Sequence, residues 1–371
     1  MKRTSFRGAV VPTVAALTLG FGLAACGAAN DSGDSNGGDD SGLSGELAGG
    51  GSSAQDKAQQ AWRAAFQTDN SDVTITYDPV GSGDGRQNFI SAAYAFAGSD
   101  SYLSDDEGEL SDAKERCGGE DPIEVPAYVS PIAVAFNLPG VDSLNLSAKT
   151  IAQIFAGKIT KWDDAAIAAD NKDVELPSTA ISPVHRSDDS GTTKNFTDYL
   201  SQAGEGAWTA DPDGIWPLKS GEAAEGTSGV VGALTAGEGT IGYADDSAIK
   251  ETDLGVASIK VGTEFNAPSA EGAAQVVAES PAAEGRPAVD MAIDVDRTTT
   301  ESGAYPLLLT SYLIACQHYD DATQADLVKG FLTYILSADG QQAAADEAGS
   351  APLDTTVAAK ATGIVEKIAA K

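Results

Sequence analysis

Residues 185–200, with the sequence HRSDDSGTTKNFTDYL, join a short predicted strand at 181–184 to a predicted helix. We expect this helix to begin after Ser190, whose hydroxyl group can cap its first turn. A helix start presents free N–H groups and about half a positive charge, which together suit an anion. Arg186 adds a planar fork of donors that matches a tetrahedral oxyanion, and Asp188 could orient that fork through a salt bridge. The alternative interpretation is a surface Arg–Asp pair beside an ordinary helix cap.

Two other segments rich in glycine and serine also precede predicted helices. GGGSSA at 49–54 leads into a predicted helix at 54–66, capped by a serine, and GSGDG at 81–85 leads into one at 86–96. Glycine lets an anion approach the backbone closely, and serine adds a hydroxyl donor. One such segment usually does no more than cap its helix. Three of them in one chain favour an oxyanion site assembled from several helix starts.

The pattern beyond these segments alternates between strands and helices, which is typical of an α/β fold. Residues 124–136 contain β-formers and two prolines, and we expect them to run as extended chain between two units. The continuous apolar run at 306–316 predicts a buried strand. Further strands are expected at 73–77 and 240–243. Further helices are expected at 148–156, 163–169, 227–235, 323–336 and 356–369.

The sequence offers little material for catalysis or for metal binding. It contains no P-loop spacing and no Cys/His zinc spacing. A Ser–His–Asp triad would need His185 or His318, and both are interpreted as structural residues. A phosphatase would need a metal pair or an activated nucleophile, and neither pattern occurs. We therefore expect no enzyme, no metal site and no cofactor.

The formal net charge is −32 at pH 7, from 55 acidic and 23 basic residues. This charge argues against nucleic acid as a partner, because phosphate backbones bind clusters of Lys and Arg. It also argues against docking to anionic lipid by charge. It does not exclude one small anion, because surface carboxylates are largely screened beyond about 10 Å at physiological salt. A desolvated site with one arginine and neutral dipoles depends on short hydrogen bonds rather than on the overall field.

The first residues are interpreted as an export signal. A basic start precedes a small or apolar stretch, and this pattern predicts a secretory signal peptide at 1–25. The ending Leu-Ala-Ala-Cys resembles the lipobox of bacterial lipoproteins and predicts lipid attachment at Cys26. An ordinary signal or an N-terminal anchor helix is the alternative. Residues 26–45 are mostly Gly, Ser, Asp and Asn, which predicts a disordered tether.

Two cysteines, Cys117 and Cys316, remain after Cys26. In an exported protein, two remaining cysteines favour a disulfide. Cys117 is expected in a polar, glycine-rich loop where a lone thiol would be exposed. Closing a loop of about two hundred residues could stabilise the fold by up to about 5 kcal/mol in the chain-entropy model. The alternative is a pair of free buried thiols.

Four segments of the mature chain resemble one known family. They are residues 185–200, IFAGKITKWDD at 154–164, AGSD at 97–100 and GTIGY at 239–243. Together they resemble the phosphate-binding lipoprotein of bacterial phosphate ABC importers, the PstS family. The first matches that family's Arg-x-Asp-x-Ser-Gly-Thr helix start, and the second matches its Gly-Lys-Ile-x-x-Trp-x-Asp signature.

The resemblance implies a two-lobed α/β fold of the periplasmic-binding-protein type (type II), with a hinge and a ligand cleft between the lobes. The first lobe is expected to combine residues 46–129 with 305–371, and the second to span 130–304. Two features depart from the family pattern. Ser53-Ala54 stand where the better-known pattern has Thr-Phe, and residues 104–121 form an extra stretch.

The resemblance also implies a phosphate site formed by residues of both lobes. Asp100 would accept a hydrogen bond from the ligand, because phosphate near neutral pH still carries a proton whereas sulfate does not. Asp188 would hold the guanidinium of Arg186 in place. The full set of expected ligand-binding residues is Ser53, Ala54, Ser82, Asp100, Arg186, Asp188, Ser190, Gly191 and Thr192.

The implied function is capture of inorganic phosphate and its delivery to membrane permease subunits driven by a cytoplasmic ATPase. The protein is expected to be a monomer, held by lipid on Cys26 at the outer face of the cytoplasmic membrane. Four alternatives remain open: a binder of another tetrahedral oxyanion such as sulfate, a phosphate sensor, a secreted phosphatase and a purely structural surface lipoprotein.

Overall fold

The computed structural model describes residues 42–105 and 108–371, which form one compact unit. The predicted signal peptide, Cys26 and most of the predicted tether lie outside the described residues. Within the described part of the chain, no helix has the length and apolar character needed to cross a membrane.

Strands and helices alternate through most of the described chain, as the sequence predicts. The helices are α1 (Asp56–Asp69), α2 (Ser82–Ile90), α3 (Glu109–Arg116), α4 (Ala148–Phe155), α5 (Ala165–Asp170), α6 (Gly191–Ala203), α7 (Gly226–Ala236), α8 (Asp246–Ile249), α9 (Ala270–Glu279), α10 (Ala322–Leu336), α11 (Ala338–Ala348) and α12 (Thr355–Val365). The strands are β1 (Gly45–Gly51), β2 (Val73–Asp78), β3 (Phe96–Ser99), β4 (Ile123–Phe136), β5 (Ser143–Leu146), β6 (Ser182–Arg186), β7 (Glu222–Ala224), β8 (Thr240–Asp245), β9 (Gly255–Val261), β10 (Glu264–Asn266), β11 (Leu308–Ala315), β12 (His318–Tyr319) and β13 (Ala369–Ala370).

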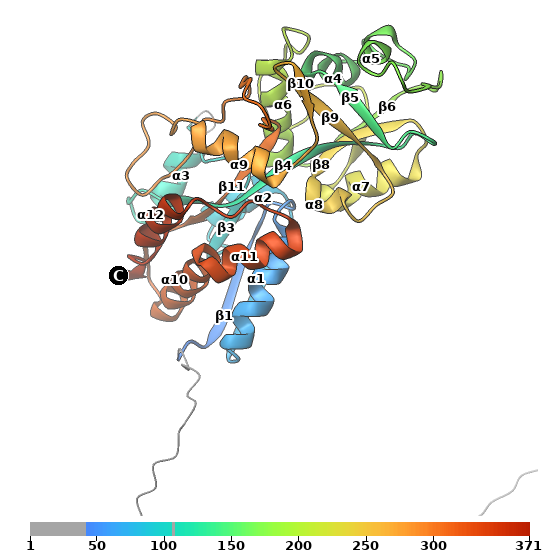
Figure 1. Ribbon diagram of the computed structural model, residues 1–371. Coiled ribbons are helices and arrows are strands. Elements are labelled where there is room, and N and C mark those ends of the chain that lie inside the picture. Colours follow the sequence, from blue (N-terminus) through green and yellow to red (C-terminus); the bar gives the residue numbers. More distant parts are fainter. Residues whose placement is uncertain (1–41, 106–107) are drawn as a thin grey trace, which may run out of the picture. The chain divides into compact units, whose positions relative to one another are not determined.

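One long strand, β4, belongs to both halves of the main sheet. The strand order is β2-β1-β3-β11-β4-β8-β6-β7, with β9 attached to β4 and carrying β5 and β10. Up to Pro131, β4 pairs antiparallel with β11, and from Ile132 onward it pairs antiparallel with β8. This arrangement gives two lobes (Figure 1). We call the part built on β1–β3 and β11 the first lobe, and the part built on β5–β10 the second lobe.

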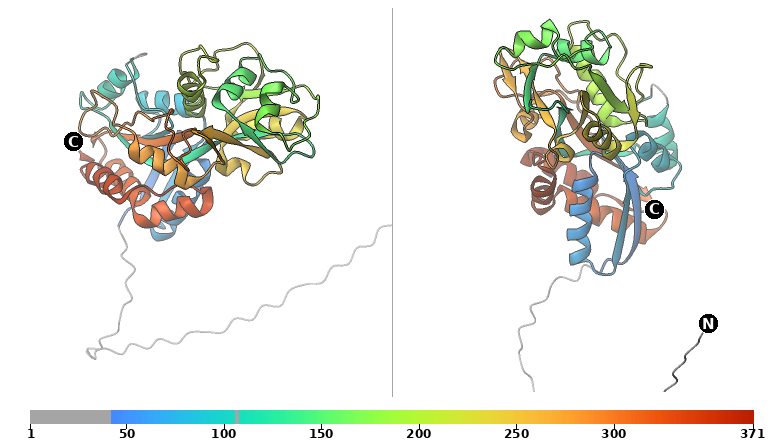
Figure 2. Two further views of the ribbon diagram at one scale, coloured as in Figure 1. Left: turned by 45° about the horizontal axis from the view of Figure 1, so that its top comes forward. Right: turned by 90° about the vertical axis from the view of Figure 1, so that its right-hand side faces the viewer.

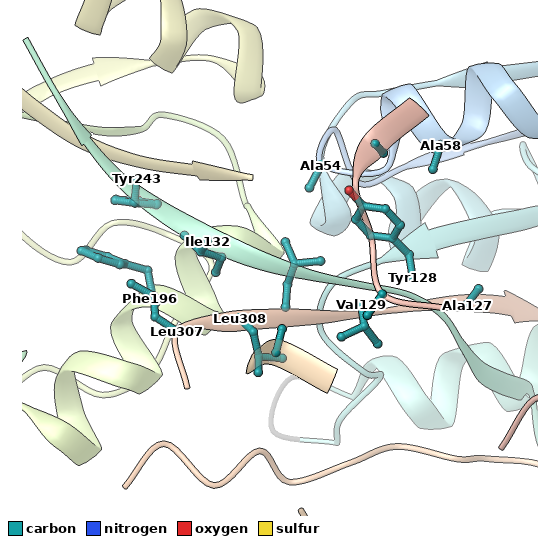
Figure 3. Close-up of a cluster of buried hydrophobic side chains, with 14 of the residues drawn as sticks. Ala54, Ala58, Ala127, Tyr128, Val129, Ile132, Phe196, Tyr243, Leu307 and Leu308 are labelled. Carbon is teal, nitrogen blue, oxygen red and sulfur yellow. The ribbon is translucent and has the colours of Figure 1, made fainter. Parts of the chain in front are cut away.

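The strands β4 and β11 form the core that the two lobes share. Every residue of both strands is buried. The apolar run at 306–316 predicts this burial for β11, and the extended chain predicted at 124–136 is the strand β4. Figure 3 shows Tyr128, Ile132 and Leu308 along this crossing, with Ala58 on the side of the first lobe and Tyr243 on that of the second. Burial of one large apolar side chain contributes about 1.5–3 kcal/mol. The two crossing strands therefore join the lobes through a continuous packed core.

Helices α1, α10 and α11 lie together against the sheet of the first lobe (Figures 1 and 2). The indole N–H of Trp62 on α1 donates to the carbonyl of Gly340 on α11 at 2.7 Å. The ring of Phe66 meets that of Phe331 on α10 edge to face, with centroids 5.4 Å apart. These contacts fix α1 against α10 and α11, so that the turn before it, which carries Ser52 and Ser53, has a defined position.

Two predicted helices differ from the structure at their starts. The helix predicted at 54–66 begins at Asp56 after Gln55, and no side chain caps it, so the predicted serine cap is wrong. The helix predicted at 86–96 spans Ser82–Ile90 instead, and Phe96 begins β3. Gly81, with a φ of 101°, turns the chain directly into α2. The helix therefore starts within the glycine-rich segment rather than after it.

The glycine-rich stretch before α1 was not predicted as a strand, yet it forms β1. This strand pairs in parallel with β2 on one side and with β3 on the other. Backbone hydrogen bonds to the two neighbouring strands hold β1 in place. Because its sequence is mostly glycine, it lacks the β-branched and aromatic side chains from which a strand is usually predicted. The end of the predicted tether at 45 therefore already lies in β1, and Leu43 packs against the core.

The segment at 286–294 lies along the first lobe. The backbone N–H of Met291 donates to the carbonyl of Glu124 on β4 at 2.7 Å. Arg286 forms ion pairs with Glu124 at 2.7 Å and with Asp290 at 2.8 Å. The predicted boundaries place this segment in the second lobe, whereas these contacts are made with the part of β4 that pairs with β11.

The predicted disulfide between Cys117 and Cys316 is present in the structure, with the two Cα atoms 5.3 Å apart. It joins the end of α3 to the residue that follows β11. The two cysteines are 199 positions apart in sequence. The bond therefore ties the extra stretch at 104–121, through the end of α3, to a central strand of the first lobe.

Replacing both cysteines by serine (Cys117→Ser with Cys316→Ser) is expected to lower the free energy of unfolding by about 3 kcal/mol, because the unfolded chain loses a long-range constraint. Chemical denaturation of both proteins under oxidising conditions measures the difference. Wild type treated with a reductant should match the double variant. A double variant as stable as oxidised wild type would contradict the expected contribution of the bond.

Candidate anion-binding site

The segment at 185–200 forms the strand end and helix start that the sequence predicts. Strand β6 ends at Arg186, and α6 begins at Gly191 with Ser190 as its N-cap. The hydroxyl of Ser190 accepts a hydrogen bond from the backbone N–H of Thr193 at 3.2 Å. Ser190 and Thr192 are both buried. The first turn of α6 therefore directs its free N–H groups into the interior of the protein.

Arg186 and Asp188 form the predicted ion pair. The Nε of Arg186 donates to Oδ1 of Asp188 at 2.8 Å, and Nη2 donates to Oδ2. The backbone N–H of Gly226 donates to Oδ1 as well, at 3.0 Å. Burial alone would raise the pKa of Asp188, but the hydrogen bonds and the charge of Arg186 lower that pKa below its ordinary value. Asp188 engages Nε and Nη2, so the third nitrogen, Nη1, stays outside the pair.

Asp100 is a buried carboxylate directly after β3, with 3% of its surface exposed. Its Oδ1 accepts a hydrogen bond from the hydroxyl of Ser311 at 2.6 Å, and its Oδ2 accepts one from the hydroxyl of Thr192 at 3.3 Å. Burial raises the pKa of Asp100, whereas hydrogen bonds from Ser311 and Ser52 and the charge of Arg186 oppose that rise. The donors around this carboxylate therefore stabilise its ionised form.

The start of α6 lies directly against the first lobe. A Cβ atom added at Gly191 would lie 2.6 Å from the Cβ of Asp100 and 2.6 Å from the hydroxyl of Ser82. Only glycine leaves room at this position. The hydroxyl of Ser82 also accepts a hydrogen bond from the backbone N–H of Asp100 at 3.1 Å. The structure therefore brings Ser82, Asp100, Gly191 and Thr192 together.

Ser53 and Ala54 lie in the turn before α1, where Ser53 contacts the second lobe. The hydroxyl of Ser53 lies 3.0 Å from that of Thr227 and accepts a hydrogen bond from the backbone N–H of Thr227 at 3.2 Å. The backbone N–H of Ala54 donates to the hydroxyl of Ser52 at 3.1 Å. Ser53 therefore links the first lobe to the start of α7, and Ser52 is the serine that reaches Asp100.

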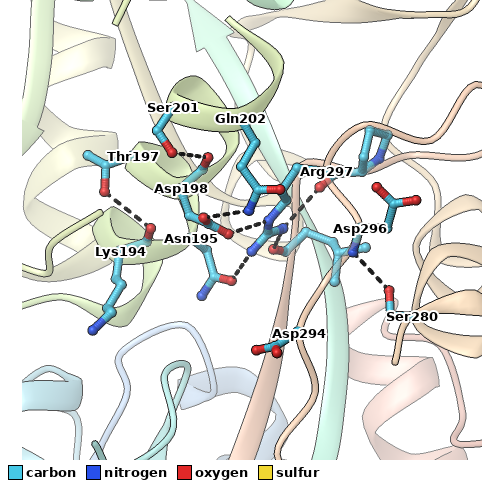
Figure 4. A network of polar contacts seen from close by, with 12 residues as sticks. Lys194, Asn195, Thr197, Asp198, Ser201, Gln202, Ser280, Asp294, Asp296 and Arg297 are labelled. Carbon is cyan, nitrogen blue, oxygen red and sulfur yellow. Dashed lines mark hydrogen bonds and ion pairs between the residues drawn. The ribbon is translucent and has the colours of Figure 1, made fainter. Parts of the chain in front are cut away.

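Several residues around Asp100 were not identified from the sequence. Asn195 on α6 donates from Nδ2 to the carbonyl of Asp100 at 2.7 Å and accepts a hydrogen bond from Arg297 (Figure 4). Gln55 donates to the hydroxyl of Ser311 at 2.6 Å. A cavity of about 900 Å³ adjoins Asp100, Asn195 and Arg297. The polar pair Thr310-Ser311 inside an otherwise apolar run is the one sequence signal that could have indicated Ser311.

The two histidines occupy structural positions, as predicted. His185 stacks on Trp216, with ring centroids 4.8 Å apart, and its Nδ1 contacts the carbonyl of Arg186 at 2.9 Å. His318 pairs with Glu120 at 2.6 Å. Over residues 42–105 and 108–371, no cluster of His, Cys, Asp or Glu has the arrangement of a metal site. The residues around Asp100 and the start of α6 can bind an anion by hydrogen bonds. Asp100 is positioned to accept a hydrogen bond from an anion that carries a proton.

Comparisons with known proteins agree on one family. Residues 36–339 match the family described as the PBP superfamily domain. The chain is similar to phosphate-binding protein PstS2 of Mycobacterium bovis (strain BCG), with 34% identity over 371 residues, 97% of this chain and 98% of the relative. It is also similar to phosphate-binding protein PstS 3 of Mycobacterium tuberculosis, with 35% identity over 323 residues, 86% of this chain and 85% of the relative. A periplasmic high-affinity phosphate-binding protein solved with bound phosphate matches with a TM-score of 0.68 and 25% identity, over 86% of this chain and 93% of that one.

Proposed function

The chain belongs to the PBP superfamily, as a member of the PstS phosphate-binding proteins, and on this premise we propose that it captures inorganic phosphate outside the cytoplasm and delivers it to an ABC importer. Its relatives carry the names of binding proteins, and capture by hydrogen bonds needs no covalent chemistry.

This proposal rests on one observation: the buried carboxylate of Asp100, in the first lobe, lies in contact with the start of α6, in the second lobe. Thr192 donates to that carboxylate at 3.3 Å, and Arg186 is close enough to influence its pKa. A phosphate ion held by Arg186, the N–H groups of the first turn of α6 and the hydroxyls of Ser82 and Ser190 still needs an acceptor for its proton. Asp100 is that acceptor in the proposed site.

Ligand capture in this proposal is a hinge motion of the two lobes. The lobes are proposed as 46–129 with 305–371, and 130–304, with the part of the second range at 286–294 lying on the first lobe. β4 and β11 form the hinge, because β4 changes its partner strand between Pro131 and Ile132. Hydrogen bonds that join the lobes, such as the one from Asn195 to Asp100, belong to the closed form.

The proposal extends to the location and partners of the protein. A lipid on Cys26 anchors it to the outer face of the cytoplasmic membrane, and the segment up to β1 acts as a tether. The closed form docks as a monomer on permease subunits, which a cytoplasmic ATPase drives. The named relatives and the lipobox-like ending at Cys26 support this part of the proposal.

Phosphate at a thousandfold excess over its Kd is expected to stabilise the protein by about 4 kcal/mol, because the ligand binds only the folded state. Calorimetric melting with and without phosphate measures this gain, and sulfate at the same concentration is expected to leave the melting temperature unchanged. An equal rise with sulfate would favour a general oxyanion binder. No rise with either anion would favour a structural role, and sustained hydrolysis of p-nitrophenyl phosphate by the pure protein would favour a phosphatase.

A further inference from the structure

Arg86 lies beside the proposed site without belonging to its ligand set. It stands on α2, the helix that begins with Ser82, and 8% of its side chain is exposed. Its Nε donates to both carboxylate oxygens of Glu109, at 3.0 and 2.9 Å. Glu109 begins α3, in the extra stretch that departs from the family pattern. That stretch therefore supplies the carboxylate that neutralises Arg86. Without it, burying the charge of Arg86 would destabilise the fold.

The same guanidinium reaches the two residues that flank Asp100. Its Nη1 donates to the hydroxyl of Ser101 at 2.8 Å and to that of Ser99 at 3.2 Å. Arg86 thus connects the helix that carries Ser82 to the strand end that carries Asp100. A planar guanidinium holds several partners in one fixed geometry, so this connection sets the positions of two proposed ligand groups relative to each other.

The remaining nitrogen of Arg86 faces the second lobe. Nη2 lies 3.5 Å from Oδ2 of Asp189, the residue between Asp188 and Ser190. The carboxylate of Asp189 lies over the first turn of α2, where a Cβ on Gly83 would come within 2.1 Å of Oδ2. The backbone N–H of Gly83 donates to the carbonyl of Asp189 at 3.1 Å. A helix start favours a carboxylate, so Asp189 has two attractive partners on the opposite lobe.

We propose that Arg86 is a positioning residue that orients Ser82 and Asp100 within the first lobe and latches the closed form through Asp189. This inference rests on the proposed function, because the latch acts on phosphate held between the lobes. The contact between Arg86 and Asp189 joins the two lobes and stabilises only the closed form. It therefore slows the release of phosphate and has little influence on the rate of capture.

The test compares release rates in two variants and a control. Asp189→Asn keeps the shape of the side chain, removes its charge and leaves the Arg86–Glu109 pair in place. It is expected to speed the dissociation of radiolabelled phosphate, chased with unlabelled phosphate, about three- to tenfold, with the association rate within about twofold of wild type. Arg86→Gln is expected to speed release at least as much. The matched control is Glu205→Gln, which removes one carboxylate from an exposed ion pair with Lys149 inside the second lobe. It should change neither the release rate nor the association rate.

The two substitutions should also be coupled. Once Arg86→Gln is present, adding Asp189→Asn is expected to change the release rate by clearly less than it does in the wild type, because only the attraction of Asp189 to the start of α2 remains to be lost. Release from Asp189→Asn at the wild-type rate, or effects of the two substitutions that simply multiply, would refute the latch while leaving phosphate capture intact. If Arg86→Gln does not fold, Asp189→Asn decides alone. Failure of the wild type to bind phosphate would refute the proposed function, and the latch with it.

Discussion

Arg186→Ala is expected to raise the Kd for phosphate about a thousandfold, or about 4 kcal/mol. The guanidinium is buried, with 3% of its side chain exposed, and Asp188 fixes its orientation. A hydrogen bond to a charged group contributes about 1.5–3 kcal/mol, and a guanidinium presents two such bonds in parallel to an oxyanion. Titration calorimetry with phosphate measures the loss. A Kd within about tenfold of wild type would contradict the proposed role of Arg186.

Two further variants separate loss of binding from loss of folding. Arg186→Ala leaves Asp188 as an unpaired, partly buried charge, which costs stability by itself. Arg186→Ala combined with Asp188→Ala removes both charges, and we expect this variant to fold and still to fail to bind phosphate. Arg186→Lys keeps the charge but not the fork, so its Kd should fall between those of wild type and Arg186→Ala. A double variant that regains binding would show that the effect of Arg186→Ala came from the unpaired carboxylate.

The parts of the fold with strong local signals could be predicted from the sequence. The start of α6 was predicted because Ser190 as a cap, the glycine after it and the apolar spacing of the helix all agree. β11 was predicted because a buried central strand is continuously apolar, whereas β4, with its two prolines, was predicted only as extended chain between two units. The disulfide followed from a count of cysteines in an exported chain.

Other features depend on contacts that no local pattern records. β1 is rich in glycine and is a strand because β2 and β3 flank it. Ser311 reaches Asp100 across 211 positions of sequence, and Arg86 reaches Asp189 across 103. The first pair becomes neighbours only when β3 and β11 are paired in the folded sheet, and the second only when the two lobes are together. Periodicity and spacing therefore cannot indicate either pair. For the same reason nothing in the sequence indicated that Ser52 contributes a hydrogen bond to Asp100.

The acidity of the chain, with a net charge of −32, does not conflict with a buried anion site. Asp188 neutralises part of Arg186, Glu109 neutralises Arg86, and Asp100 itself is negative. The local arrangement is therefore not strongly positive. In the proposed site, capture depends on dipoles and directed hydrogen bonds rather than on net charge. The proposal therefore assigns the choice between one anion and another to Asp100.

Asp100→Asn is expected to remove most of the discrimination between phosphate and sulfate. The wild type should prefer phosphate at least about a thousandfold, because sulfate has no proton for the carboxylate and would leave a buried charge facing another negative group. Asparagine has no charge and can donate to either anion from its amide. The preference is therefore expected to fall to about tenfold or less, mainly through a gain in sulfate affinity. Calorimetric titration of both proteins with both anions measures the two ratios.

Ser311→Ala is the matched control for this result, because it removes a hydroxyl that donates to Oδ1 of Asp100 at 2.6 Å and leaves the carboxylate itself in place. Losing that donor raises the pKa of Asp100 further, since the hydrogen bond from Ser311 opposes the effect of burial. The variant should bind phosphate more weakly than wild type and still reject sulfate. If Ser311→Ala lost the discrimination as fully as Asp100→Asn, the hydroxyl network rather than the carboxylate would select the ligand. Equal affinities of the wild type for both anions would refute the role of Asp100 outright.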